Sequence, residues 1–364
     1  MPILNRSPAT RLDAIALARR SVLDDGVIPS VPWVAPWVLR SWQRCLGLGL
    51  RAQQQMTFDQ VPAQQLRRTL EANHALIEAA RPVLGHLGRA IVNTRYFTLL
   101  TNACGVVVHA DGAIDPSDPR AHLITRVGTD LSEPSIGTTA IGTALTELQS
   151  VWLHRGEHFF DSTTVYSCAG APLFGPDGVC VGMLDVTGVD AQERPELRHL
   201  VMQSASKIEN ALVAAQKHAL MLRLNWPGTA LGSDADGLLC LDAEGWINGA
   251  NPVARQMVPG LPAPGLAGST HVSEVFGLPH GQLFDAAHHP NDPLELPLWT
   301  GLRLQALAID HRSEVATPAL ALRDVEAVMI RKALDEARGN VGLAARALGI
   351  GRATLYRKLG HKPG

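Results

Sequence analysis

The sequence predicts a multi-domain α+β protein, because the spacing of its apolar residues changes twice along the 364 residues. Helical spacing runs through about the first ninety residues, short strand-like runs follow, and about the last forty residues return to helical spacing. A chain of this length has room for two or three domains. The predicted parts are a helical N-terminal region (1–84), an antiparallel sheet flanked by helices (85–215, with a connector helix over 195–224), a smaller α+β module (226–310), a linker (311–321) and an all-α tail (322–364).

Composition excludes several classes of protein. No apolar run approaches the roughly 20 residues needed to span a bilayer, and the first twenty residues lack the apolar segment of a signal peptide. We therefore expect a cytoplasmic protein with no membrane partner. The cysteines are odd in number and lack CxxC spacing, which argues against a disulfide framework and against a zinc site. These five residues, expected to be reduced thiols, are Cys45, Cys104, Cys168, Cys180 and Cys240.

In the N-terminal region, helical spacing is carried by Leu12, Ile15 and Val22 and resumes from Leu66 to Leu87. Between these stretches, Trp42 stands among arginines in the segment RSWQRC (residues 40–45). Such a tryptophan can stack on a ligand or a base. Aromatic residues mainly anchor cores and interfaces, so we expect Trp42 to pack against the next domain.

From Tyr96 onward the pattern predicts strands, and the clearest element is a hairpin. Its strands run over 165–174 and 179–186, and Gly175-Pro-Asp-Gly178 forms the turn. A helix is expected to open near Thr138, which is a plausible cap. An antiparallel sheet flanked by helices is the economical fold for this segment.

Polar residues among the apolar runs of this segment predict a half-buried pocket for a small molecule. Cys168 and His158, with Glu157 beside it, form a nucleophile arrangement on paper. However, no resolving cysteine is near in sequence, strand cysteines are commonly buried apolar residues, and isolated histidines are usually structural. We therefore expect no catalytic residue, no metal or haem and no other cofactor. The candidate ligand-binding residues are Thr138, Thr139, Trp152, His158, Phe159, Tyr166 and Cys168.

The connector helix predicted over 195–224 has an apolar seam with two interpretations. Steps of four and three residues suit a parallel dimer that transmits motion, and they suit equally a helix packed on its own sheet. The seam residues are Leu197, Val201, Ser204, Ile208, Ala211, Ala215 and Leu222. In the module that follows, two strands over 237–248 lead into a helix that begins near Asn251. His288 and His289 are expected in a loop without metal, since no further ligand has convincing spacing.

The tail reads as three helices joined by tight turns. The first, about 322–338, ends at Gly339, and Asn340 can cap the second. The second helix is expected to turn Leu343, Ala344, Ala347 and Leu348 inward, and the third, about 352–359, to bury Leu355 and Leu359. A short turn between the last two helices, containing Gly349, is typical of a DNA-reading helix-turn-helix.

Charge supports DNA binding by this tail. From Arg323 onward nine Lys/Arg face four Asp/Glu, a surplus of five, whereas the whole chain is at −2, so the rest carries about −7. A basic patch confined to one terminal domain suits phosphate binding. The candidate DNA-binding residues are Arg346, Arg352, Ala353, Thr354, Tyr356, Arg357 and Lys358.

The run from Gly339 to Leu359 resembles the C-terminal helix-turn-helix of the Fis family of bacterial regulators. Gly351 departs from that family, which usually has Ser or another capping residue there. The segments RSWQRC, GTTAIGTAL, EHF, CAGAPLFGPDG and GVCVGMLDVTG resemble the GAF sensor domain of AcoR-like regulators, which respond to acetoin and similar small metabolites. At Thr139 that family usually has Asn. The hairpin and Asn251 helix resemble the opening of a PAS domain.

These resemblances imply a ligand-responsive transcription regulator. Regulators of this kind usually carry a AAA+ ATPase that remodels sigma-54 polymerase and needs a Gly-Lys phosphate loop, but none of the five lysines here follows a glycine. We therefore expect no ATPase activity and no enzyme. The expected partners are a small-molecule effector, double-stranded DNA with an inverted repeat, and a second copy of the chain, with RNA polymerase as a further candidate. Two alternatives stay open: a GAF-based redox enzyme of the methionine sulfoxide reductase type, and a regulator that competes with a full-length sigma-54 activator.

Overall fold

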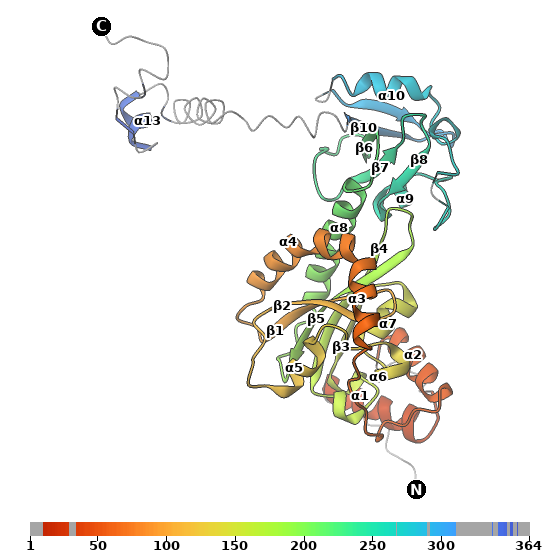
Figure 1. Cartoon of the computed structure of the whole chain (residues 1–364), viewed down its shortest axis with the longest axis vertical. Coiled ribbons are helices and arrows are strands. Elements are labelled where there is room, and N and C mark those ends of the chain that lie inside the picture. Colours follow the sequence, from red (N-terminus) through yellow and green to blue (C-terminus); the bar gives the residue numbers. More distant parts are fainter. Residues whose placement is uncertain are drawn as a thin grey trace. The chain divides into compact units, whose positions relative to one another are not determined.

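The computed structural model describes residues 10–28, 34–266, 268–289, 292–310, 337, 341–347, 350, 351 and 355. The chain divides into two compact units, Met1–Ile309 and Asp310–Gly364. The first unit holds two five-stranded sheets, and the described part of the second holds one short helix (Figure 1). No helix among the described residues is both long and apolar enough to cross a membrane.

The N-terminal segment is helical, as predicted. Thr10 begins the first helix through a reciprocal capping box with Asp13, and Pro36 opens the second at a position where its missing N–H costs nothing. The helices are α1 (Arg11–Arg19), continued by a π-helical turn (Arg20–Asp24), α2 (Pro36–Gly47), α3 (Ala63–Ala72) and α4 (His74–Ala90). The boundary expected at residue 85 falls inside α4, because one continuous apolar face of this helix packs on the first sheet.

The first sheet has the strand order β2-β1-β5-β4-β3, and each neighbouring pair is antiparallel. The predicted hairpin is present as β4 and β5. The strands are β1 (Tyr96–Asn102), β2 (Val107–Gly112), β3 (Val151–His154), β4 (Tyr166–Phe174) and β5 (Cys180–Val189). The helices of this domain are α5 (Pro119–Thr125), α6 (Glu133–Ile136), α7 (Ala140–Glu147) and α8 (Leu197–Ala214), with 3₁₀ turns at Arg155–Glu157 and Asp161–Thr163.

Both faces of this sheet are buried, because strand residues alternate between two apolar clusters. On one face the side chains of β1, β4 and β5 pack against α4 and α8. On the other they pack against α1, α2 and α5 to α7. The sheet is therefore the middle layer of three.

The connector helix is shorter than predicted. It ends at Ala214, and the chain turns into a strand, β6 (Leu220–Asn225), so Leu222 is a strand residue. Four seam residues, Leu197, Val201, Ser204 and Ile208, are buried against the helix's own domain. Of the two interpretations of the seam, packing on its own sheet is the one that the structure supports.

The second sheet has the order β8-β7-β6-β10-β9, with β6 at its centre. This module therefore begins at residue 220 and not at 226, because β6 supplies the middle strand. The other elements are β7 (Gly237–Leu241), β8 (Ile247–Ala250), α9 (Pro252–Met257), a 3₁₀ turn (Val272–Glu274), α10 (His280–Ala286), β9 (Leu294–Pro297) and β10 (Arg303–Asp310). Asn251 caps α9 as its sequence position suggested, accepting from Ala254 N at 2.8 Å.

The turn of the β4–β5 hairpin is bound to this second module. Pro176 O accepts from Ala250 N at 2.8 Å and from the Arg255 guanidinium at 3.0 Å, and Asp177 O accepts from Gly265 N at 3.1 Å. Gly178 lies in the left-handed region at φ 83°, and a Cβ there would stand 2.8 Å from the Arg255 guanidinium carbon. The hairpin and the second module are therefore in close contact at this turn.

In the tail, α13 (Val341–Ala347) carries two buried alanines, Ala344 and Ala345, which pack with the buried Leu355. Leu343 was expected to point inward but is 54% exposed. The inward face is formed by residues 341, 344 and 345, which follow the i, i+3, i+4 pattern, and position 343 falls outside it. The predicted positions 347, 348 and 359 lie outside what is described for side chains.

Candidate functional site

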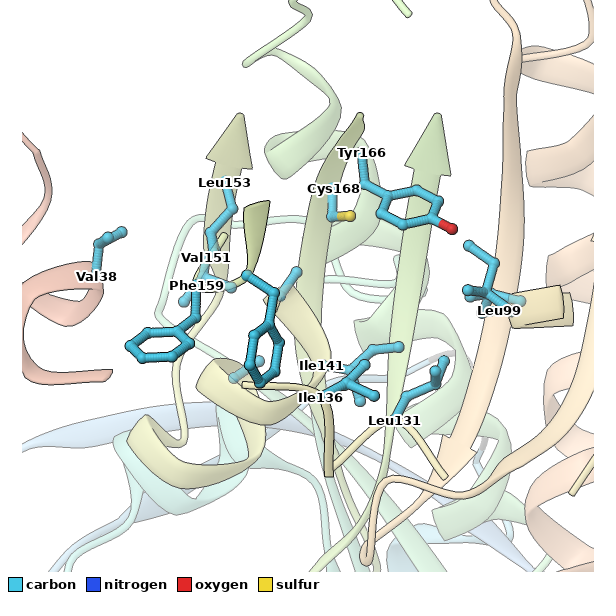
Figure 2. Packing of buried hydrophobic residues seen from close by; sticks show 14 of the residues in the cluster. Val38, Leu99, Leu131, Ile136, Ile141, Val151, Leu153, Phe159, Tyr166 and Cys168 are labelled. Carbon is cyan, nitrogen blue, oxygen red and sulfur yellow. The ribbon is translucent and has the colours of Figure 1, made fainter. Parts of the chain in front are cut away.

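The first domain contains a cavity between its sheet and the helices α5, α6 and α7. Figure 2 shows Leu131, Ile136 and Ile141 on one side and Leu99, Tyr166 and Cys168 of the strands on the other. It spans about 340 Å³ counted to its opening, of which only about 30 Å³ admits the centre of a water molecule. About 10–15 Å³ of such space holds one water, so the cavity suits a molecule of a few heavy atoms. Its lining is Phe58, Leu99, Ile124, Leu131, Ile136, Thr139, Ala140, Ile141, His158, Thr163, Tyr166, Cys168, Asp185 and Thr187.

The loop before α7 shapes one wall of the cavity. Gly137 turns the chain at φ 64°, and a Cβ there would lie 2.8 Å from Cβ of Phe159, so only glycine allows this approach. Thr139 then caps α7 by accepting from Gly142 N at 3.2 Å. The cap was expected one residue earlier, at Thr138.

Four polar side chains form a hydrogen-bonded row along the cavity. His158 Nδ1 lies 3.0 Å from Arg155 O, so Nδ1 carries the hydrogen and Nε2 is free to accept from the Cys168 thiol at 3.4 Å. Cys168 Sγ lies 3.2 Å from the Thr187 hydroxyl, which donates to Asp185 Oδ2. A hydroxyl has one hydrogen, and a carboxylate accepts it more strongly than a sulfur does. Asp185 Oδ1 has no hydrogen-bond partner in the described structure.

Burial sets the protonation of this row. It raises the pKa of Asp185 to about 7, against the opposing effect of the Thr187 hydrogen bond. It raises the pKa of the Cys168 thiol well above its ordinary value and lowers the pKa of His158 to about 4. Cys168 and His158 are therefore neutral near pH 7, and the pair lacks the thiolate that a nucleophilic cysteine needs.

The cavity brings together four of the seven residues predicted for ligand binding: Thr139, His158, Tyr166 and Cys168. Trp152 lies on the opposite face of the sheet, because successive strand residues alternate and Val151 and Leu153 occupy this face.

The other two predicted residues lie close to the cavity but do not line it. Phe159 is buried in the core beside Gly137. The Thr138 hydroxyl is bonded towards α2, 2.7 Å from the Ser41 hydroxyl oxygen. Because the Ser41 hydrogen goes to the Glu133 carboxylate, Thr138 is the donor of this bond.

Asp185 and Thr187 were missed by the sequence reading. They lie at alternate positions of β5, in the segment LDVTG, whose other residues are mostly apolar. An aspartate in the middle of a strand that is buried on both faces is the signal that could have found them, since charged residues there are rare without a partner or a task.

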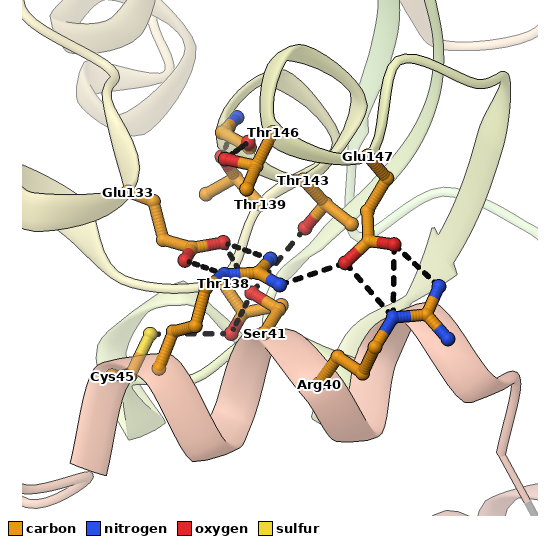
Figure 3. A network of polar contacts seen from close by, with 11 residues as sticks. Arg40, Ser41, Cys45, Glu133, Thr138, Thr139, Thr143, Thr146 and Glu147 are labelled. Atoms are coloured by element: carbon orange, nitrogen blue, oxygen red, sulfur yellow. Dashed lines mark hydrogen bonds and ion pairs between the residues drawn. The ribbon is translucent and has the colours of Figure 1, made fainter. Parts of the chain in front are cut away.

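Helix α2 is fixed to the cavity loop by a buried polar network (Figure 3). Glu133 in α6 accepts from Arg44 Nε at 2.6 Å, from Arg44 Nη2 at 2.9 Å and from the Ser41 hydroxyl at 2.6 Å. Arg44 also pairs with Glu147 in α7 at 2.7 Å. The network ties the RSWQRC segment to the helices whose neighbouring residues line the cavity.

Trp42 has the packing role that the sequence predicts. Its side chain is fully buried in the core shared with the sheet, and its indole N–H donates to Glu157 O at 2.9 Å. Of the predicted DNA-binding residues, Arg346 lies exposed on α13. Arg352, Ala353, Thr354, Tyr356, Arg357 and Lys358 lie outside the described residues.

Comparison with known proteins assigns both ends of the chain. Residues 10–210 match the family described as "MimR, N-terminal domain", and residues 321–360 match "Bacterial regulatory protein, Fis family". The acetoin catabolism regulatory protein of Cupriavidus necator is 31% identical over 255 residues, which is 68% of this chain and 37% of that protein. The propane 2-monooxygenase operon activator MimR of Mycolicibacterium goodii is 32% identical over 182 residues, 49% of this chain and 30% of that protein.

The chain thus spans about a third of the length of these curated relatives. Among solved structures, the Escherichia coli DhaR(N)–DhaL complex aligns with a TM-score of 0.46 at 16% identity, covering 76% of this chain and 99% of that one.

Proposed function

The chain belongs to the family of the MimR N-terminal domain, and on this premise we propose that it is a transcription regulator that binds a small molecule through its GAF-like domain and DNA through its Fis-type tail. The observation that carries the proposal is the partly open, largely apolar cavity inside the domain that defines the family. A cavity walled by apolar side chains with a few convergent polar groups is the usual form of a small-molecule site.

The proposed effector is a small organic molecule. The space inside the cavity favours few heavy atoms, and its apolar walls favour an uncharged or weakly polar compound. The names of two relatives refer to acetoin and to propane, which are molecules of this size. Thr139, His158, Tyr166 and Cys168 are the predicted residues that we propose contact it, together with Asp185 and Thr187.

The proposed DNA interface is the tail. Its net charge and its Fis-family match support binding to double-stranded DNA, with Arg346, Arg352, Thr354, Arg357 and Lys358 as base or phosphate contacts and Ala353 and Tyr356 beside them. We propose a homodimer formed through the tail, since the α8 seam is occupied by its own domain. Such a dimer would bind an inverted repeat in the cytoplasm and can contact RNA polymerase there.

We assign no catalytic role. The redox alternative needs a reactive cysteine, and the neutral, fully buried Cys168 lacks that character. The relatives are named as regulators, which favours binding over turnover. Activation, repression and competition with a longer activator are distinguished by transcription from the bound promoter.

The test is binding of the full chain to DNA from its own upstream region, followed by fluorescence anisotropy at several salt concentrations. A panel of small alcohols, ketones and aldehydes is then added, and specific binding that one compound shifts supports the proposal. Ala140→Val, which fills the cavity, should abolish the shift and leave DNA affinity unchanged. Ala144→Val is the matched control, because Ala144 is equally buried on α7 but does not line the cavity. Loss of the response in both variants, or in neither, would argue against the cavity as the effector site.

A further inference from the structure

One polar atom of the cavity is left without a partner. The side chain of Asp185 is fully buried, Thr187 donates to its Oδ2, and Oδ1 receives no hydrogen bond in the described structure. The neighbouring polar groups are engaged elsewhere: Cys168 and His158 with each other, and the Tyr166 hydroxyl as donor to a main-chain carbonyl at 3.1 Å. In the ionised carboxylate, which prevails above the Asp185 pKa of about 7, Oδ1 is therefore an acceptor in need of a donor.

The rest of the lining narrows what can supply that donor. Apolar side chains form most of the walls, and burial keeps His158 neutral. Of the described lining residues, Asp185 alone carries a charge, and it does so above its pKa of about 7. An ammonium ligand would bring a second charge, with three N–H groups to satisfy, into this setting. A hydroxyl brings one donor, and the carbon atoms attached to it suit the apolar walls.

We infer that the cavity selects effectors that carry a hydroxyl group on a short aliphatic skeleton, and that the Oδ1 atom of Asp185 is the group that reads the hydroxyl. This inference rests on the proposed function, because it names the ligand class of that same cavity. A ketone of the same skeleton has no donor and would leave Oδ1 unpaired on binding. A site built to bond a hydroxyl discriminates strongly against an analogue that lacks it.

The Thr187 hydrogen bond makes a substitution at Asp185 informative. In Asp185→Asn, the Thr187 hydroxyl still needs an acceptor, so the amide oxygen takes the place of Oδ2. The amide NH₂ then takes the place of Oδ1 and presents a donor to the cavity. The variant should therefore prefer an acceptor ligand, and the preference between alcohol and ketone should reverse.

The test is run at about pH 8.5, where Asp185 is ionised. It uses the full chain with isoleucine methyl labels and three compounds of one skeleton: 2-butanol, 2-butanone and 2-aminobutane. Methyl chemical shifts of Ile124, Ile136 and Ile141, which line the cavity, report binding there. We expect wild type to bind 2-butanol at least tenfold more tightly than 2-butanone, which corresponds to about 1.4 kcal/mol. Asp185→Asn should bind 2-butanone more tightly than 2-butanol, and Thr187→Ser, which keeps the hydroxyl, should retain the wild-type order.

Equal or tighter binding of the ketone by wild type would overturn the inference, and so would an unchanged preference in a folded Asp185→Asn. Tighter binding of the amine would replace the hydroxyl by a cation as the recognised group. If no compound shifts the methyl groups, the hydroxyl inference also fails. Failure of the hydroxyl inference is separate from failure of the proposed function. The proposed function still holds if another compound alters DNA binding by wild type but not by Ala140→Val. The wild-type comparison needs no variant, so a folding defect in Asp185→Asn does not remove the test.

Discussion

Replacement of Arg44 by Met should loosen α2 far more than the same replacement of Arg40 one turn earlier. Arg44 makes two bonds to Glu133, whose side chain is 6% exposed, and one to Glu147. Without Arg44, the Glu133 carboxylate stays buried with the Ser41 hydroxyl as its remaining side-chain donor. Arg40 is 49% exposed and bonds only Glu147, which would keep Arg44 as a partner.

The magnitudes follow from this difference in burial. Breaking a fully buried ion pair by removing one partner costs about 3–5 kcal/mol, and the 32% exposure of the Arg44 side chain lowers our expectation to about 2–3 kcal/mol. The exposed Arg40 pair should contribute far less, because solvent screens it. The two arginines stand four residues apart on the same helix, so the pair of variants controls for helix propensity and for net charge.

Amide hydrogen exchange of α2 measures the effect locally, which suits a chain of several domains. A loss of about 2–3 kcal/mol accelerates exchange of the protected amides about 30- to 150-fold, because each 1.4 kcal/mol is a factor of ten. Arg40→Met should accelerate it by about fivefold or less. Equal acceleration by both variants, or less than threefold by Arg44→Met, would refute the assignment of the anchor to the Arg44–Glu133 pair. A double variant with Glu133→Gln isolates the pairwise part.

Three further outcomes are expected. Burial raises the pKa of Glu209 to about 7, so the protonated side chain favours the folded state. This contribution to the free energy of unfolding is lost as the pH rises from about 4.5 through 7. Between pH 5 and 8 the loss is about 2.5 kcal/mol, and Glu209→Gln should remove that part of the decline measured by urea unfolding. A pH profile identical to wild type would contradict this. Gly182→Ala should impair folding, since its Cβ would lie 2.2 Å from a carbonyl oxygen of β1. Gly281→Ala in α10 is the control, because its Cβ would meet open space. Similar melting temperatures for the two variants would show that β1 can shift to make room. Cys168, buried with a raised pKa, should react with iodoacetamide far more slowly than the exposed Cys104, and comparable rates in peptide mapping would count against a neutral thiol.

Local patterns predicted the elements of this fold better than their extents. The β4–β5 hairpin follows from Gly175-Pro-Asp-Gly178, where turn chemistry acts over four residues. The segment after Ala214 was read as helix because Leu222 continued a helical spacing, yet it is a strand. It pairs with β7, the next strand, and with β10, which is distant in sequence, and no local signal carries the pairing with β10.

The cavity shows the same limit at the level of single residues. Cys168, Tyr166 and His158 were found because polar residues stood out in apolar runs. Thr138 and Thr139 are adjacent, and only the path of the chain through Gly137 decides that Thr139 faces the cavity. Asp185 gains its meaning from Oδ1 having no partner, which is a property of the folded neighbourhood rather than of the residue type.

The contact between the β4–β5 turn and the second module bears on how this protein can be dissected. A fragment that stops at residue 215 would keep the hairpin but lose two hydrogen bonds to its turn. These are the bonds that Ala250 N and Gly265 N donate to the carbonyl oxygens of Pro176 and Asp177. It would also end before β6, the central strand of the next sheet. A better boundary for expression lies after β10, at residue 310. In a chimera that exchanges the second module, the incoming module must be able to bind the glycine-containing β4–β5 turn of the first domain.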